Sequence, residues 1–149
     1  MDNISIATAN WDQDQQALIR LRTEVFVVEQ KVPVEIELDG LDPNCMHVKA
    51  FIDKEYDREV IGTGRLKPDG FIGRMCVLSQ YRQQQIGTRM LNLLIQLAVE
   101  QNYPGVSLNS QSYAIPFYEK CNFIIDSDEF IDAGIPHRRM ILNLHQPSS

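Results

Sequence analysis

The chain has 149 residues, of which 44% are hydrophobic, and 20 acidic against 14 basic residues give it a net charge of −6 at pH 7. This length and composition predict a single domain with a buried core rather than a disordered chain. The acidic balance argues against a general nucleic-acid binder, which needs a basic surface. No apolar run has the length of a transmembrane helix and no signal peptide is visible, so we expect no membrane partner.

Three scattered cysteines, Cys45, Cys76 and Cys121, are odd in number, which predicts free thiols in a reducing compartment. We therefore expect a cytoplasmic protein. Cys76 lies in an apolar run with no base beside it in the sequence, so it is expected to be buried and inert rather than nucleophilic. We predict no metal site.

Hydrophobic periodicity predicts strands and helices in alternation, and hence an α/β (α+β) fold with a mixed, mostly antiparallel central sheet flanked by helices. A first strand covers Ile4–Thr8, and a helix begins near Asp12, with Gln15 completing a capping box, and continues to about Phe26. The later elements are strands over His47–Ile52, Val60–Lys67 and Phe71–Leu78, a helix from Ile86 to near Pro104, a strand over Val106–Asn109, a helix over Ile115–Cys121, and closing strands over Phe123–Asp126 and Arg138–Leu144 joined by a loop that contains Gly134–His137. One domain is expected over residues 1–145, followed by a short tail at 146–149.

The central unit is the predicted strand, polar loop and helix between Phe71 and Asn102. The first turn of a helix has unpaired backbone N–H groups and partial positive charge. With Arg82 in the loop and the bare backbone of Gly87 at the helix start, this unit is suited to a phosphate or pyrophosphate. The loop alone fits an ordinary strand-to-helix connection better, because one glycine and one arginine make a weak motif.

Two segments together resemble the GNAT N-acetyltransferase superfamily. The first, Arg82–Thr88, is similar to the family's coenzyme A loop, although Gln85 stands where a glycine is usual. The second, Ala114–Phe123, is similar to the family's Ala-x-x-x-Tyr-Glu-Lys-x-Gly-Phe segment, with Asn122 in place of the glycine. Further segments resemble a small uncharacterised bacterial subgroup of the family; they are Val25–Gln30, Asp39–Asp42, His47 and Gly134–His137.

The resemblance implies an acetyl-CoA-dependent N-acetyltransferase that passes the acetyl group directly to a primary amine of a small molecule, peptide or protein. A different class stays open, a non-catalytic CoA-binding module of the same fold, because Gln85 narrows the space for pyrophosphate. By the same resemblance, the cofactor-binding positions are Met75, Cys76 and Val77 through their backbone, the loop residues Arg82, Gln83, Gln84, Gln85, Ile86, Gly87 and Thr88, and the polar residues Asn109 and Gln111.

Tyr118 is the position that the resemblance assigns to the general acid, which protonates the departing sulfur. The base is left open between Glu29, His47 and His137, each of which can accept an amine proton directly or through water. The acidic stretch from Glu29 to Asp42 is either a solvated loop or a rim that attracts a cationic amine. The sequence leaves open the acceptor, the acyl-chain preference and a homodimer.

Overall fold

The computed structural model describes residues 3–82 and 84–144, so the predicted cofactor residue Gln83 and the predicted tail at 146–149 lie outside it. The elements, in chain order, are β1 (Ile4–Ala9), α1 (Trp11–Arg22), the π-helix η1 (Thr23–Glu29), α2 (Val34–Glu37), η2 (Asp42–Asn44), β2 (Met46–Asp53), β3 (Arg58–Leu66), β4 (Ile72–Val77), η3 (Ser79–Tyr81), α3 (Ile86–Glu100), β5 (Gly105–Gln111), η4 (Ser112–Ala114), α4 (Ile115–Lys120), β6 (Ile124–Ile125), β7 (Phe130–Asp132) and β8 (Ile135–Asn143). None of the helices in this described part is long and apolar enough to cross a membrane.

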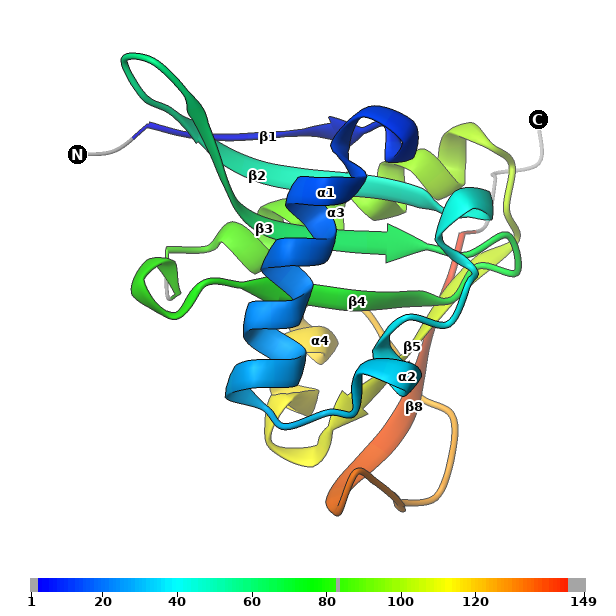
Figure 1. The fold of residues 1–149 in the computed structure, drawn as a ribbon. Helices are drawn as coiled ribbons and strands as arrows, with labels where there is room; N and C mark the ends of the chain where they lie inside the picture. Colours follow the sequence, from blue (N-terminus) through cyan, green and yellow to red (C-terminus); the bar gives the residue numbers. More distant parts are fainter. Residues whose placement is uncertain (1–2, 83, 145–149) are drawn as a thin grey trace.

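Two antiparallel sheets form the frame. The first has the order β1-β2-β3-β4, and the second has the order β5-β8-β6 with β7 also paired to β8. In Figure 1, α1 lies in front of the first sheet and α3 lies behind it. The helices α2 and α4 lie below α1, on the side where the second sheet begins. The expected mixed sheet is therefore two antiparallel sheets that meet at one place.

The helix α3 packs closely on the first sheet because two strand residues lack side chains. Its buried stripe is made of Ile86, Met90, Leu91, Leu94 and Ala98, at helical spacing. A Cβ at Gly62 would come within 3.2 Å of Met90, and one at Gly64 within 3.1 Å of Leu94. The glycines let the helix settle on β3, which fixes where its N-terminus lies relative to the end of β4.

The two sheets meet where β4 and β5 begin. Phe71 and Ser107 form a parallel bridge, and the Ser107 amide donates to the Gly70 carbonyl at 3.0 Å. Gly70 has a φ of +90°, and a Cβ there would lie 2.7 Å from the Gly105 carbonyl oxygen, so only glycine fits this junction. In the described part of the chain no further bridge joins β4 to β5. From this junction onward the two parallel strands part.

Three expected boundaries were wrong. Asn10, not Asp12, caps the first helix, accepting a hydrogen bond from the Gln13 amide. This α-helix ends at Arg22, and the expected stretch to Phe26 is the beginning of the π-helix. The segment expected as a loop at Gly134–His137 belongs largely to β8, which turns back on β7 through Ala133 and Gly134, both at positive φ (52° and 76°). Two consecutive positive φ values are typical of a tight hairpin turn. Such turns are usually marked in a sequence by Asn-Gly or Asp-Gly, so the Ala-Gly pair here did not indicate one.

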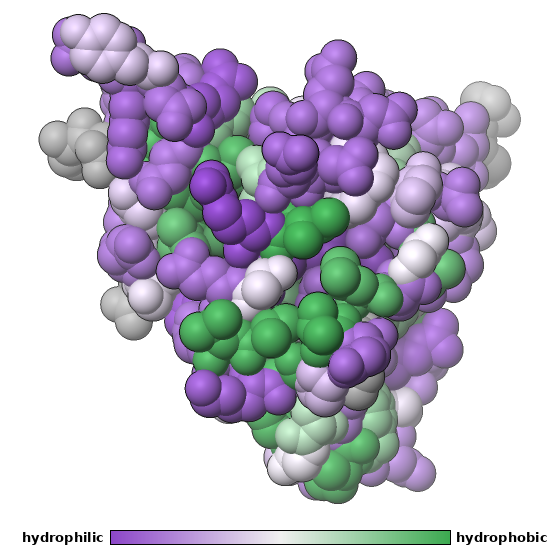
Figure 2. Space-filling model, viewed as in Figure 1, coloured by the Kyte–Doolittle hydropathy of each residue, from purple (hydrophilic) through white to green (hydrophobic). Residues whose placement is uncertain are grey.

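Exposed apolar side chains gather on the front of the molecule, over the arm formed by η1 and α2 (Figure 2). Val28, Val34, Leu38 and Leu41 are each more than 40% exposed there. A second apolar area lies at the tip of the β7–β8 hairpin, where Ile131 is 66% exposed (Figure 2).

Candidate functional site

A pocket of about 440 Å³ opens where β4 ends and α3 begins. The strand, the loop after it, the first turn of α3 and the helix α4 all contribute to its walls. Its lining residues are Val77, Tyr81, Arg82, Gln85, Ile86, Gly87, Thr88 and Phe117. Six of them are predicted cofactor-binding residues, which the fold therefore brings together; Gln84 is exposed beside them.

The backbone N–H and C=O groups of Val77 point away from β3 and into the gap between the two sheets. Val77 lies opposite Gly62, and the amide of the next residue, Leu78, donates to the Ile61 carbonyl at 2.9 Å. In an antiparallel ladder this pattern marks Val77 and Gly62 as a pair without mutual hydrogen bonds, whose N–H and C=O groups face outward. The Val77 carbonyl accepts a hydrogen bond from Arg82 Nε at 2.9 Å, and the Val77 amide faces the gap.

The first turn of α3 presents backbone N–H groups to the pocket. Gln85 precedes the helix in the left-handed conformation, with a φ of 61°, and its side chain makes no capping hydrogen bond. A Cβ at Gly87 would meet no atom within 4 Å, so nothing in the described chain requires glycine there. Glycine in a helix costs roughly 0.5–1 kcal/mol relative to alanine, and a ligand that approaches this backbone closely would explain why it is present.

Arg82 and Glu29 form a bidentate ion pair at the mouth of the pocket. The two guanidinium nitrogens Nη1 and Nη2 donate to the two carboxylate oxygens at 2.8 and 2.9 Å. The hydrogen bond from Arg82 holds the pKa of Glu29 below its usual range, and Glu29 likewise raises the pKa of Arg82. One predicted cofactor residue and one predicted base are thus partners of each other.

Tyr118 lies on α4 directly after Phe117; Phe117 lines the pocket, and Tyr118 is not among the lining residues. Its ring packs edge-on against Phe117 and Phe123, with ring centroids 4.9 and 5.9 Å apart. Burial raises the pKa of Tyr118 above its ordinary value, so the phenol stays protonated at neutral pH.

The second sheet brings three further candidates to the far side of the gap. Asn109 and Gln111 point to the same face of β5, alternating with buried Leu108 and Ser110. Gln111 lies opposite His137 of β8. His137 stacks on Phe130, and its Nδ1 contacts the Ile135 carbonyl at 2.8 Å.

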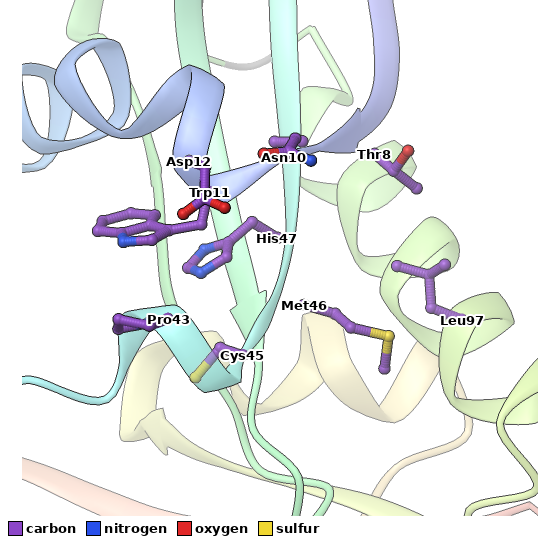
Figure 3. A pocket seen from close by; sticks show the side chains of 10 residues that line it. Thr8, Asn10, Trp11, Asp12, Pro43, Cys45, Met46, His47 and Leu97 are labelled. Carbon is purple, nitrogen blue, oxygen red and sulfur yellow. The ribbon is translucent and has the colours of Figure 1, made fainter.

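His47 lies in a different pocket, of about 350 Å³, at the other end of the first sheet. Figure 3 shows its ring between Trp11 and Cys45, and the Trp11 and His47 centroids are 4.8 Å apart. In the sheet, His47 of β2 pairs with Arg65 of β3, and Arg65 pairs with Gly73 of β4. Gly73 and Val77 are four residues apart on β4, so His47 is about 13 Å along the strand direction from the level of Val77. Burial lowers the pKa of His47, whose Nε2–H donates to the Asp42 carbonyl at 2.9 Å. The fold does not bring His47 to the gap.

The sequence model of the acetyltransferase (GNAT) domain family matches residues 24–144. The chain belongs to the GNAT acetyltransferase family. The uncharacterized N-acetyltransferase YjcF of Bacillus subtilis is 38% identical over 81% of this chain and 86% of its own.

Solved structures show the same GNAT fold. An acyl-CoA N-acyltransferase from Pseudomonas aeruginosa is 28% identical, covers 93% of this chain and 99% of its own, and gives a TM-score of 0.79. A Bacillus anthracis protein named as a streptothricin acetyltransferase, solved with acetyl coenzyme A, is 27% identical over 69% of this chain and 64% of its own, with a TM-score of 0.57. The protein is thus an acetyltransferase with the GNAT fold.

The acidic stretch of this GNAT domain turns three of its carboxylates, Glu37, Asp39 and Asp42, toward arginines, whereas Glu29 and Glu35 stay exposed. Arg22 Nε donates to Glu37 Oε1 at 2.5 Å and Arg22 Nη1 donates to Asp42 Oδ1 at 2.7 Å; the side chains of all three are at most 5% exposed. Arg65 pairs with Asp42 at 3.0 Å and with Asp39 at 2.5 Å. For Glu37, Asp39 and Asp42, neither expected alternative, a solvated loop or a charged rim, is right, because arginines neutralise these three carboxylates.

This ion cluster holds α2 against β4. Arg74, at a positive φ of 51° where the β3–β4 register shifts, lies 3.4 Å from Glu37 Oε1 and 3.3 Å from Asp39 Oδ2. Burial alone would raise the pKa of Asp42, but the hydrogen bonds and charges of Arg22 and Arg65 outweigh it and hold that pKa below its usual range. The hydrogen bond from Arg65 also holds the pKa of Asp39 well below its usual range.

Sequence reasoning missed Arg22, Glu37 and Arg65 as a group. One signal was available, because Arg22 follows Leu18 by four residues and so lies on the buried stripe of its helix. A charged residue on an apolar stripe predicts a buried partner.

The β4 residues Met75 and Cys76 have buried or partly buried side chains, as their apolar run indicates. Cys76 is buried, as predicted, and burial raises its pKa to about 12, which disfavours a reactive thiolate.

Replacing Asp42 with asparagine tests the ion cluster. Asp42→Asn removes the carboxylate that Arg22 and Arg65 share and leaves each arginine with one carboxylate partner, Glu37 or Asp39. We therefore expect the free energy of unfolding at pH 7 to fall by about 3 kcal/mol. The pKa of Asp42 is lower in the folded protein than in the unfolded chain. Its contribution to the free energy of unfolding is therefore fully present above the unfolded pKa of about 3.9 and is lost as the pH falls from that value through the folded pKa. Urea unfolding at pH 7 and pH 3 should therefore show a difference from wild type that shrinks in acid. Asp53→Asn, in the exposed pair with Arg58, should cost less than about 1 kcal/mol; equal effects of the two variants would contradict this role for the cluster.

Proposed function

We propose that this protein transfers an acetyl group from acetyl-CoA directly to a primary amine of a small molecule, peptide or protein. The observation that carries the proposal is the pocket between the end of β4 and the start of α3, with the outward-facing backbone of Val77 at one side and the uncapped turn of α3 at the other. The Bacillus anthracis relative, solved with acetyl-CoA, supports the choice of donor.

Acetyl-CoA supplies the activated thioester, and the chain supplies backbone hydrogen bonds to hold it. The Val77 amide faces the gap where it can donate to the thioester oxygen, which favours attack on the carbonyl carbon. The N–H groups of Ile86, Gly87 and Thr88 in the first turn of α3 suit the pyrophosphate. The side chains of Asn109 and Gln111, on one face of β5, suit the amide-rich pantetheine arm from the other side of the gap.

Tyr118 is the proposed acid. Transfer breaks the carbon–sulfur bond and forms a carbon–nitrogen bond, and the departing sulfur takes a proton while the amine loses one. The phenol of Tyr118 is protonated at neutral pH, and Tyr118 directly follows Phe117, the α4 residue that lines the pocket.

The proposed base is Glu29 or His137 rather than His47. Glu29 lies at the mouth of the pocket beside Arg82, and His137 lies opposite Gln111 on the second sheet. His47 lies in the separate pocket with Trp11, about four residues along the sheet from the level of Val77.

The arm beside the gap favours an acceptor with an apolar part. Glu37 of this arm, and Asp39 and Asp42 in the segment that follows it, are paired to arginines, while Val34 and the next exposed apolar residue, Leu38, are each 43% exposed. Monoamines with an apolar part are therefore the first acceptors to assay.

Thermal unfolding with and without acetyl-CoA tests the donor, with ATP as the comparison. Acetyl-CoA at 100 times its dissociation constant should add about 2.7 kcal/mol of stability, a visible rise in Tm. A rise with acetyl-CoA and little with ATP, followed by thiol release in the presence of an amine, is the expected result. No rise at millimolar acetyl-CoA would rule the proposal out.

Replacing Gly87 with alanine should move stability and binding in opposite directions. The new Cβ meets no protein atom within 4 Å and removes the flexibility of glycine, so Gly87→Ala should raise the free energy of unfolding by about 0.5–1 kcal/mol. The same methyl group would lie where the phosphates approach, so the dissociation constant for acetyl-CoA should rise at least about tenfold, equivalent to about 1.4 kcal/mol. Unfolding and calorimetric titration measure the two effects, and unchanged acetyl-CoA affinity would count against this binding geometry.

Replacing Tyr118 with phenylalanine should separate chemistry from binding. The ring contacts with Phe117 and Phe123 remain, so acetyl-CoA affinity should change little. Turnover should fall by about 10²–10⁴-fold because the proton donor is lost. Steady-state kinetics with calorimetry would show both, and normal turnover would mean that Tyr118 is not the acid.

A further inference from the structure

We propose that Arg82 is shared between Glu29 and acetyl-CoA, so that a phosphate group of the bound cofactor displaces Glu29 and releases its carboxylate into the gap. This inference rests on the proposed function, because it takes acetyl-CoA as the ligand of the pocket. It assigns Glu29 a role before the chemical step, that of a competitor for the cofactor's own binding residue.

Glu29 occupies the pair of adjacent N–H groups that Nη1 and Nη2 of Arg82 present together. Nη1 and Nη2 both donate to Glu29, at 2.8 and 2.9 Å, and Nε donates to the Val77 carbonyl at 2.9 Å. A phosphate held by both nitrogens of the fork must therefore take the place of the carboxylate. Arg82 also lines the pocket together with Gly87 and Thr88, at the α3 turn proposed for the phosphates.

The pair is exposed enough to exchange. The side chains of Arg82 and Glu29 are 39% and 43% exposed, whereas the buried partners Arg22 and Glu37 are each 1% exposed. Exposed ion pairs are weak because both charges stay hydrated. A phosphate brings more negative charge to the same fork and has the α3 turn as a second point of attachment, so it wins the competition.

A Glu29 carboxylate that Arg82 no longer holds can act on the amine acceptor. Glu29 ends η1, the first part of the arm that carries Val28 and Val34 beside the gap. While Arg82 holds it, the carboxylate is bound at both oxygens, and its pKa is lowered by that hydrogen bond. Once released, it is free to hold the ammonium group of the acceptor or to take its proton.

Isothermal titration with acetyl-CoA tests the competition in wild type, Glu29→Gln, Arg82→Gln and the double variant. Glu35→Gln is the matched control, since Glu35 is an exposed carboxylate of the same arm that is not paired with Arg82. Thermal unfolding of each variant confirms that it is folded.

Glu29→Gln should bind acetyl-CoA about twofold to fivefold more tightly than wild type, because the competing carboxylate is gone. The gain should disappear in the Arg82→Gln background, and Glu35→Gln should behave as wild type. Equal or weaker binding by Glu29→Gln, or a gain that persists without Arg82, would overturn the inference. Wild type that binds no acetyl-CoA would instead refute the proposed function itself, so the two failures are distinct.

Discussion

The parting of β4 from β5 is the constraint on which the rest of the site depends. Two parallel neighbours that begin side by side at Phe71 and Ser107 would ordinarily pair along their length, but among the described residues they pair only at that bridge. The backbone of Val77 consequently faces a gap instead of a strand. Backbone N–H groups are obligatory hydrogen-bonding groups, so a gap of this kind favours a ligand that can pair with them. Gly70 makes the junction sharp, since a side chain there would collide with β5.

The elements around the gap are held by two different kinds of interaction. Behind the first sheet, α3 is set by apolar packing over Gly62 and Gly64, which places its first turn at the end of β4. In front, the arm is held by charge, through the buried cluster of Arg22, Glu37 and Asp42. Because the carboxylates of this region point inward to the arginines, apolar side chains such as Val34 and Leu38 are left on its outer surface, where Figure 2 shows an apolar area.

The sequence predicted the parts of the site that depend on local order. The apolar run of β4, the glycine of the first turn of α3 and the helical stripe from Ile86 to Leu97 are readable because strand and helix periodicities differ. The outward direction of Val77 depends on its register with Gly62, and the ion cluster joins Arg22 to Asp42 across 20 positions, so neither follows from local pattern. The strand β7 was missed because its turn is made by Ala133 and because Pro136 favours a loop.

An NMR titration of the amide-labelled protein with acetyl-CoA tests the central claim most directly. The account predicts that the amide signals of Val77 and Gly87 shift, and that the Val77 amide becomes protected from exchange with solvent. The signals of Trp11 and His47, in the separate pocket at the other end of the sheet, should stay in place. Shifts confined to Trp11 and His47, or a Val77 amide that exchanges as before at saturating acetyl-CoA, would contradict it.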